Sequence, residues 1–208
     1  AATAGAPATA GNQTEVSVVE WSVCGIPSSS SSSFGASHTH TQTRFFSRHL
    51  HACGQPDDKW LATSGSDGVA RIWSARGELQ RVLKRHNGTV FSLQWSPSGR
   101  HLLTGGVDRS SIVWDAERGE VAQQFTNHTA AVLDVAWRDD TSFVSCSSDK
   151  TIFAYELGRT LPVRHLIGHT NDVNAVEWDP TRTVLASCSE DGKTIKLVSL
   201  DAHFLRAV

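Results

Sequence analysis

The chain has 208 residues, of which 39% are hydrophobic and 19% are charged, a composition typical of a globular protein with a core. Its formal net charge of −2 argues against binding to nucleic acid or to a membrane surface through bulk charge. No run of 18 apolar residues is present, which argues against a membrane span. Four cysteines without close pairing favour a reduced, intracellular setting. The absence of methionine, even at position 1, favours a piece of a longer protein.

The N-terminal third combines one strand pattern with low-complexity sequence. Residues 1–11 lack the basic flank and apolar stretch of a signal peptide, and we expect them to be disordered. Val16 to Trp21 has the pattern of a strand, but the strand that should follow it begins only near Trp60. The stretch between them includes the unbroken serine run Ser28–Ser33, so we expect residues 22–58 to form a disordered insertion.

From residue 60 onward, four residue types recur with a period of 41 or 42 residues, which is the length of one unit in several repeat architectures. A complete unit opens with a histidine, has a tryptophan at the end of its first apolar stretch, and then an aspartate followed by an aromatic residue. The recurring positions are Asp67, Asp108, Asp149 and Asp191; Trp73, Trp114 and Tyr155; His86, His128 and His169; and Trp95, Trp137 and Trp178.

Each unit has the pattern of four short strands joined by Gly, Asn, Asp and Ser turns. In the second unit the expected strands are 90–95, 101–105, 111–114 and 121–125. No segment shows an apolar period of 3.6 residues, so no helix is expected. The sequence therefore predicts an all-β fold.

These residues resemble the WD40 family, and Trp114-Asp115 is its signature dipeptide. The resemblance implies a WD40 β-propeller, of which this chain supplies about four blades of an incomplete seven- or eight-bladed ring. The propeller region is expected over residues 12–208, with blades at about 15–84, 86–125, 128–166 and 169–208.

The resemblance also implies a structural network in each blade, running from a tryptophan through a strand Ser or Thr to the histidine and the aspartate. Buried polar groups of this kind need each other as hydrogen-bond partners, so we assign the network no catalytic role. Its expected members are Thr63, Asp67 and Trp73; His86, Thr104, Asp108 and Trp114; His128, Ser145, Asp149 and Tyr155; and His169, Ser187 and Asp191. Three positions depart from the pattern: Asn12 replaces the first histidine, Tyr155 replaces a tryptophan, and Val198 or Leu197 replaces the last one.

WD40 domains bind partners through the turns that precede the first strand and the aspartate, which places ten residues of this chain on a binding rim. Phe91 and Leu133 each follow the apolar residue that starts a strand. At a β-bulge they would point outward as anchors, and otherwise they would pack inside. The mixed apolar and acidic character of the rim favours a peptide with basic residues. The expected rim residues are Ser66, Thr89, Phe91, Val107, Ala131, Leu133, Ser148, Asp172, Asn174 and Glu190.

Longer runs narrow the resemblance to the transducin-β-like F-box-like/WD-repeat family, including its plant relatives. They are 61–73, 103–115, 123–125 followed by 133–137, and 168–180 followed by 185–189. The resemblance implies a non-catalytic subunit of a nuclear histone-deacetylase corepressor complex that acts in transcriptional repression. Its implied partners are histone tails and corepressor and deacetylase subunits. The implied location is the nucleus, with the cytoplasm as a second location, and no cofactor is expected.

Two other functions stay open at this point. A generic WD40 adaptor, such as a substrate receptor of a ubiquitin ligase, would use the same rim. A metalloenzyme would use the histidine-rich part of the insertion, where His38, His40, His49, His51 and Cys53 could bind zinc or copper; no spacing among them matches a known zinc finger. Elsewhere, Cys146 and Cys188 occupy equivalent positions three residues before an aspartate, and we expect both to be buried packing thiols.

Overall fold

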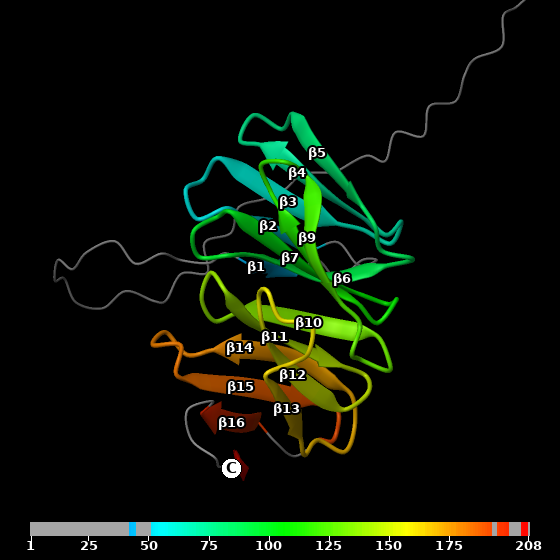
Figure 1. Cartoon of the computed structure of the whole chain (residues 1–208), viewed down its shortest axis with the longest axis vertical. Coiled ribbons are helices and arrows are strands. Elements are labelled where there is room, and N and C mark those ends of the chain that lie inside the picture. Colours follow the sequence, from blue (N-terminus) through cyan, green and yellow to red (C-terminus); the bar gives the residue numbers. More distant parts are fainter. Residues whose placement is uncertain (1–41, 45–50, 193–194, 200–204, 208) are drawn as a thin grey trace, which may run out of the picture. The chain divides into compact units, whose positions relative to one another are not determined.

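The computed structural model describes residues 42–44, 51–192, 195–199 and 205–207, all of which belong to one compact unit spanning residues 35–208. The described residues form seventeen strands in four antiparallel sheets, which we call blades 1 to 4 (Figure 1). Blade 1 comprises β1 (Gln42–Arg44), β2 (His51–Gly54), β3 (Trp60–Ser64), β4 (Val69–Ser74) and β5 (Leu79–Lys84). Blade 2 comprises β6 (Val90–Trp95), β7 (His101–Gly106), β8 (Ser111–Asp115) and β9 (Glu120–Phe125). Blade 3 comprises β10 (Val132–Trp137), β11 (Ser142–Ser147), β12 (Thr151–Glu156) and β13 (Arg164–Ile167). Blade 4 comprises β14 (Val173–Trp178), β15 (Val184–Ser189), β16 (Ile195–Ser199) and β17 (Leu205–Ala207).

Within every blade, each strand pairs with the next one along the chain. This order follows from the short turns between strands, because antiparallel neighbours need only a few connecting residues. The all-β prediction is confirmed, and the four strands expected in blade 2 agree with β6 to β9 to within one residue at each end.

Blade 1 differs from the prediction at its first strand. β2 pairs with β3 and is extended, so the expectation that residues 22–58 form a disordered insertion is wrong for residues 51–54. The turn between the two strands is closed by a hydrogen bond of 2.8 Å from the Gln55 N–H to the Trp60 carbonyl, next to the Gly54–Leu61 pair. The expectation of disorder is also wrong for β1, which pairs with β2, and residues 55–58 form the turn before β3. The rest of that insertion, the segment 1–11 and the predicted strand Val16–Trp21 lie outside the described residues.

The hydrophobic core lies between adjacent blades rather than inside one sheet. Neighbouring residues of a strand face opposite sides, so Leu102 packs with Ile72 and Trp95 on the blade 1 side. Leu103 packs on the other side in a cluster that includes Phe143 of blade 3. A third cluster joins blades 3 and 4. Stacking is therefore what buries both faces of each inner sheet.

A repeated hydrogen bond connects the first strands of successive blades. The indole N–H of Trp95 donates to the Cys53 carbonyl at 3.0 Å, and that of Trp137 donates to the Gln94 carbonyl at 3.1 Å. The indole of Trp178 donates to the Ala136 carbonyl in the same way, at 3.4 Å. Each tryptophan that ends a first strand thus donates to the residue before the equivalent position of the previous blade.

Asp134 is a buried residue that joins three blades. Its Oδ1 accepts a hydrogen bond from the Ser92 hydroxyl of blade 2 at 2.7 Å and from the Val135 N–H at 3.0 Å. Its Oδ2 accepts from the Val176 N–H of blade 4 at 3.1 Å. The sequence analysis missed Asp134 because the aspartate is not periodic: Ser92 and Ala175 occupy the equivalent positions by strand register.

The two equivalent cysteines differ in burial. Cys146 is fully buried in the cluster that joins blades 3 and 4, near Val173 and Val176. Cys188 is exposed, so the expectation that it is a buried thiol is wrong. The physical reason is that Cys188 lies on blade 4, and among the described residues no blade packs against the far face of that sheet.

A candidate peptide-binding rim

The predicted network of blade 2 is complete. The Trp114 indole N–H donates to Thr104 Oγ1 at 2.9 Å, and Thr104 Oγ1 lies 2.8 Å from His86 Nε2. His86 Nδ1 lies 3.0 Å from Asp108 Oδ1, and Asp108 Oδ2 accepts the Asn87 N–H at 2.8 Å. A proton on His86 Nδ1 donates to the Asp108 carboxylate, since an ionised carboxylate can only accept.

Blade 3 has the same histidine and aspartate contacts. His128 lies 2.8 Å from both Ser145 Oγ and Asp149 Oδ2. Tyr155 replaces the tryptophan, and its buried ring packs against Phe125 and other aromatic side chains. Burial raises the pKa of the Tyr155 phenol, although a hydrogen bond with Ser145 acts in the opposite direction. The phenol therefore stays protonated and uncharged at neutral pH.

Blade 4 keeps the network up to its serine. His169 lies 2.8 Å from Ser187 Oγ and 2.9 Å from Asp191 Oδ2. The register pairs Leu185 with Val198, as it pairs Leu102 with Trp114, so Val198 occupies the tryptophan position. A valine has no group that can donate to the serine, and the blade 4 network is one member shorter.

Blade 1 replaces the histidine contact by an arginine. The Trp73 indole donates to Thr63 Oγ1 at 2.9 Å, as in blade 2. The Arg71 guanidinium donates to Asp67 Oδ2 at 2.7 Å, and this hydrogen bond is the main cause that lowers the Asp67 pKa. Asn12, which takes the histidine position in the sequence pattern, lies outside the described residues.

The network aspartates are ionised anchors of the turns. Burial alone would raise the Asp108 pKa, but hydrogen bonds from His86, from the Asn87 N–H and from Ser110 together hold it well below its usual range. Asp149 is held low against burial in the same way, chiefly by His128 and Thr151. Because each polar atom of the network serves another, this cluster has the character of a brace rather than of a reactive site.

One backbone hydrogen bond recurs at the rim of three blades. The Val107 N–H donates to the Thr89 carbonyl at 2.9 Å, the Ser148 N–H to the Ala131 carbonyl at 3.1 Å, and the Glu190 N–H to the Asp172 carbonyl at 3.0 Å. The structure therefore brings the two groups of rim residues together pairwise, one pair in each blade. The Thr89 hydroxyl also reaches the Ser66 carbonyl of blade 1 at 3.5 Å.

Of the two alternatives for Phe91 and Leu133, the structure shows the β-bulge, and a third first strand has one as well. The register shifts between Val90 and Ser92, between Val132 and Asp134, and between Val173 and Ala175. The bulged residues are Phe91 and Leu133, which are half-buried, and Asn174, which is exposed. A bulge re-aims its side chain, and it makes Phe91 and Leu133 partly accessible at the rim.

Sequence reasoning missed the cationic residues in the rim turns. Arg109 and Lys150 directly follow the network aspartates, and both are exposed with positive φ angles of 68° and 72°. Gly68 and Gly192 occupy the equivalent positions of blades 1 and 4, with φ of 77° and 73°. The signal was available, because a position that is glycine in two repeats indicates a left-handed turn in all four.

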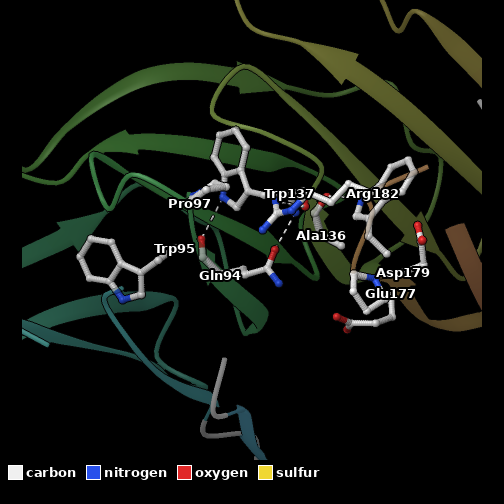
Figure 2. Close-up of a pocket in the computed structure, with 10 residues that line it drawn as sticks. Gln94, Trp95, Pro97, Ala136, Trp137, Glu177, Asp179 and Arg182 are labelled. Atoms are coloured by element: carbon white, nitrogen blue, oxygen red, sulfur yellow. Dashed lines mark hydrogen bonds between the residues drawn. The ribbon is translucent and has the colours of Figure 1, made fainter. Parts of the chain in front are cut away.

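A cavity of about 360 Å³ lies at the opposite ends of the same first strands. Figure 2 shows Gln94 beside Trp137, joined to it by hydrogen bonds through both its side chain and its carbonyl. Asp179 caps its own turn through Thr181 and Thr183, and Arg182 donates to the Arg138 carbonyl at 2.6 Å. These polar groups already have local structural roles, which makes the cavity a weaker candidate than the rim.

The residues considered for a metal site are not gathered in the described part of the chain. His51 and Cys53 lie in β2, where burial raises the pKa of the Cys53 thiol to about 12. His38, His40 and His49 lie outside the described residues. Among described residues, no group of three or more His, Cys, Asp and Glu could hold a metal ion. The described part of the chain also contains no helix that is long and apolar enough to cross a bilayer.

Comparisons with known proteins agree with this architecture. The chain is 47% identical over 129 residues to the F-box-like/WD repeat-containing protein TBL1X of Mus musculus, covering 62% of this chain and 24% of that protein. It is 38% identical to the WD40 repeat-containing protein HOS15 of Arabidopsis thaliana, over 63% of this chain and 21% of that protein. The chain thus spans about a quarter of the length of these relatives.

A solved structure of similar fold is the C-terminal WD40 domain of Sif2, with a TM-score of 0.65 and 29% identity, covering 72% of this chain and 43% of that one. The family described as "WD domain, G-beta repeat" matches residues 40–74, 77–115, 119–156 and 160–197. These four matches account for more than half of the chain. Each of the last three begins with the last strand of one blade and continues through the first three strands of the next. The chain therefore belongs to the WD40 repeat family and resembles the TBL1-like members of it.

Proposed function

We propose that this chain is part of a non-catalytic scaffold that binds protein segments on the rim and works in a nuclear histone-deacetylase corepressor complex. The observation that carries the proposal is that structural residues and accessible residues alternate in the rim turns. The histidines and aspartates are committed to one another inside the turns, while the residues beside them are half-buried or exposed. An extended partner segment could contact those residues without disturbing a blade.

The likeness to TBL1X and HOS15 supports the corepressor part of the proposal, through the family resemblance described above. Corepressor and deacetylase subunits and histone tails are therefore the proposed partners, and the nucleus is the proposed location. A propeller face suits such a role because it presents loops from a rigid scaffold. The rim includes Phe91 and Leu133, which are half-buried and offer apolar contact area to a partner.

The test uses the full-length protein that carries this chain, tagged and recovered from nuclear extract. Immunoblots for deacetylase and corepressor subunits should be positive, and Phe91→Ser with Leu133→Ser should reduce their recovery at least fivefold. Val121→Ser, which changes an exposed residue of the outer strand β9, is the matched control. Recovery of neither subunit by the unmutated protein would reject the corepressor role. Recovery that is unaffected by the rim pair would reject the rim as the binding surface.

A ubiquitin-ligase substrate receptor is the second candidate, because it would use the same rim. Recovery of a cullin complex without deacetylase in the same experiment would favour it.

A further inference from the structure

The rim changes its chemistry from blade to blade. Each of blades 2 to 4 contributes a triplet, which we define as the residue before the first strand, the bulged residue and the residue before the network aspartate. The triplets are Thr89, Phe91 and Val107 in blade 2; Ala131, Leu133 and Ser148 in blade 3; and Asp172, Asn174 and Glu190 in blade 4. The first is aromatic and aliphatic, the second small and aliphatic, and the third acidic.

We propose that the rim binds an extended peptide segment in one orientation, with apolar side chains on blades 2 and 3 and a lysine or arginine side chain on blade 4. This inference rests on the proposed function, because it assigns subsites to the same rim. It adds the polarity of the bound segment and the chemical class of residue that each end must carry.

The apolar end is held in place by close backbone packing. Val107 is 42% exposed although its neighbours in β7 are buried. Gly88 lies directly against it, so that a Cβ on Gly88 would come within 2.6 Å of Val107 Cγ1. The Val107 side chain is thus in contact with Gly88 on one side and exposed on the other. Phe91, in the same triplet, is half-buried. An apolar side chain fixed before binding loses little conformational entropy when a partner covers it.

The acidic end places two carboxylates on one turn pair. The Glu190 N–H donates to the Asp172 carbonyl, so the two residues are held side by side. The Asn174 amide donates to Glu190 Oε1 at 3.4 Å, which directs that carboxylate toward the bulge. A carboxylate pair with an adjacent amide suits an ammonium or guanidinium group, because both are donors without acceptors.

The cations in the turns enforce the direction. Within residues 51–192, Arg109 and Lys150 place positive charge in the rim turns of blades 2 and 3, and Gly192 takes that position in blade 4. A cationic side chain over the turns of blades 2 and 3 would therefore meet like charge. Charge complementarity of this kind fixes register and orientation more than it adds affinity.

The experiment uses a synthetic, terminally blocked peptide with two leucines at one end, two lysines at the other and a Gly/Ser spacer between them. Two versions carry a benzophenone photo-crosslinker, one beside the leucines and one beside the lysines. We expect the leucine-end probe to crosslink at or beside the triplets of blades 2 and 3, and the lysine-end probe at or beside the triplet of blade 4, as mapped by mass spectrometry.

Charge variants supply the second readout. Asp172→Asn with Glu190→Gln should weaken binding of the lysine peptide about tenfold in fluorescence anisotropy, with little effect on a peptide in which both lysines are glutamine. Glu117→Gln with Glu120→Gln, which neutralises two exposed carboxylates outside the rim, is the matched control and should leave both affinities unchanged. Thermal melts verify that the variants stay folded.

The outcomes separate the two proposals. Crosslinks from both probes that spread evenly over the three blades, or that map in the reverse order, would reject the orientation and leave the rim as a binding surface. Crosslinks that fall only outside the rim, or no crosslinks at all, would reject the orientation together with the rim.

Discussion

The Ser92 hydroxyl donates a 2.7 Å hydrogen bond to the carboxylate of Asp134, and this contact joins blade 2 to blade 3 inside the stack. The other carboxylate oxygen accepts the Val176 N–H of blade 4. One side chain therefore fixes the relative positions of three first strands, which in turn carry the rim bulges.

Asp134→Ala should destabilise the chain by about 2–4 kcal/mol, because it leaves buried donors without their charged acceptor. Ser92→Ala removes only one partner and should cost about 1 kcal/mol. Urea unfolding followed by tryptophan fluorescence measures both. A loss for Asp134→Ala no larger than that for Ser92→Ala would contradict the bridging role.

The free energy of unfolding should decrease as pH is lowered, because the network aspartates become protonated. The folded-state pKa of Asp149 lies below its unfolded value, so the stabilisation is fully present above about pH 4 and is lost as pH drops toward the folded-state pKa. Asp149→Asn should be less stable at neutral pH and should show a shallower loss between pH 5 and pH 3. Asp57→Asn, an exposed residue outside the network, should follow the unmutated protein. Urea midpoints across this pH range test the difference, and equal slopes for Asp149→Asn and the unmutated protein would count against it.

In the left-handed turns, substitutions to glycine should stabilise the chain and substitutions from glycine should destabilise it. Arg109→Gly and Lys150→Gly should each stabilise the chain by about 0.5–1 kcal/mol, because glycine adopts positive φ without the Cβ clash. Gly192→Ala should cost about 1 kcal/mol, since an added Cβ meets nothing nearby and only the backbone conformation is penalised.

Gly68→Ala should cost more than Gly192→Ala, because its Cβ would lie 2.8 Å from the Gly88 carbonyl oxygen. Thermal melts of the four variants rank them. A Gly68→Ala variant as stable as Gly192→Ala would show that the blade 1 turn does not press against blade 2 as described.

Thiol labelling should distinguish the equivalent cysteines. In a Cys24→Ser background, maleimide should modify Cys188 rapidly in the folded protein. Cys53 and Cys146 should react only in denaturant, because both are buried and the raised Cys53 pKa leaves little thiolate at pH 8. Peptide mapping after a timed quench gives the three rates. Comparable rates for Cys146 and Cys188 would contradict the difference in burial.

Periodicity explains what the sequence could predict. His86, Asp108 and Trp114 recur at a fixed spacing, and residues that recur in this way have the same place in every repeat. The repeat also puts Phe91 and Leu133 in equivalent positions, but the choice between a bulge and inward packing needed the register shifts of the first strands. The choice between Val198 and Leu197 needed the strand register, which selects Val198.

Features that break the repeat could not be predicted. Asp134 has no equivalent aspartate in the other blades, so nothing marked it as a bridge. β2 ends in Gly54 where the other first strands end in tryptophan, and its pattern therefore did not look like a strand. The exposure of Cys188 depends on what packs against blade 4, which is a property of neighbours rather than of the local sequence.

Gly54 also has a consequence for mechanical behaviour. By register it pairs with Leu61 as Trp95 pairs with Leu102, yet it has no indole. Blades 2, 3 and 4 each donate an indole hydrogen bond to the blade before them, but β2 cannot do so. Any blade that packs against that side of blade 1 would form an interface without this indole hydrogen bond. Under force or heat, the blades should separate at that interface first.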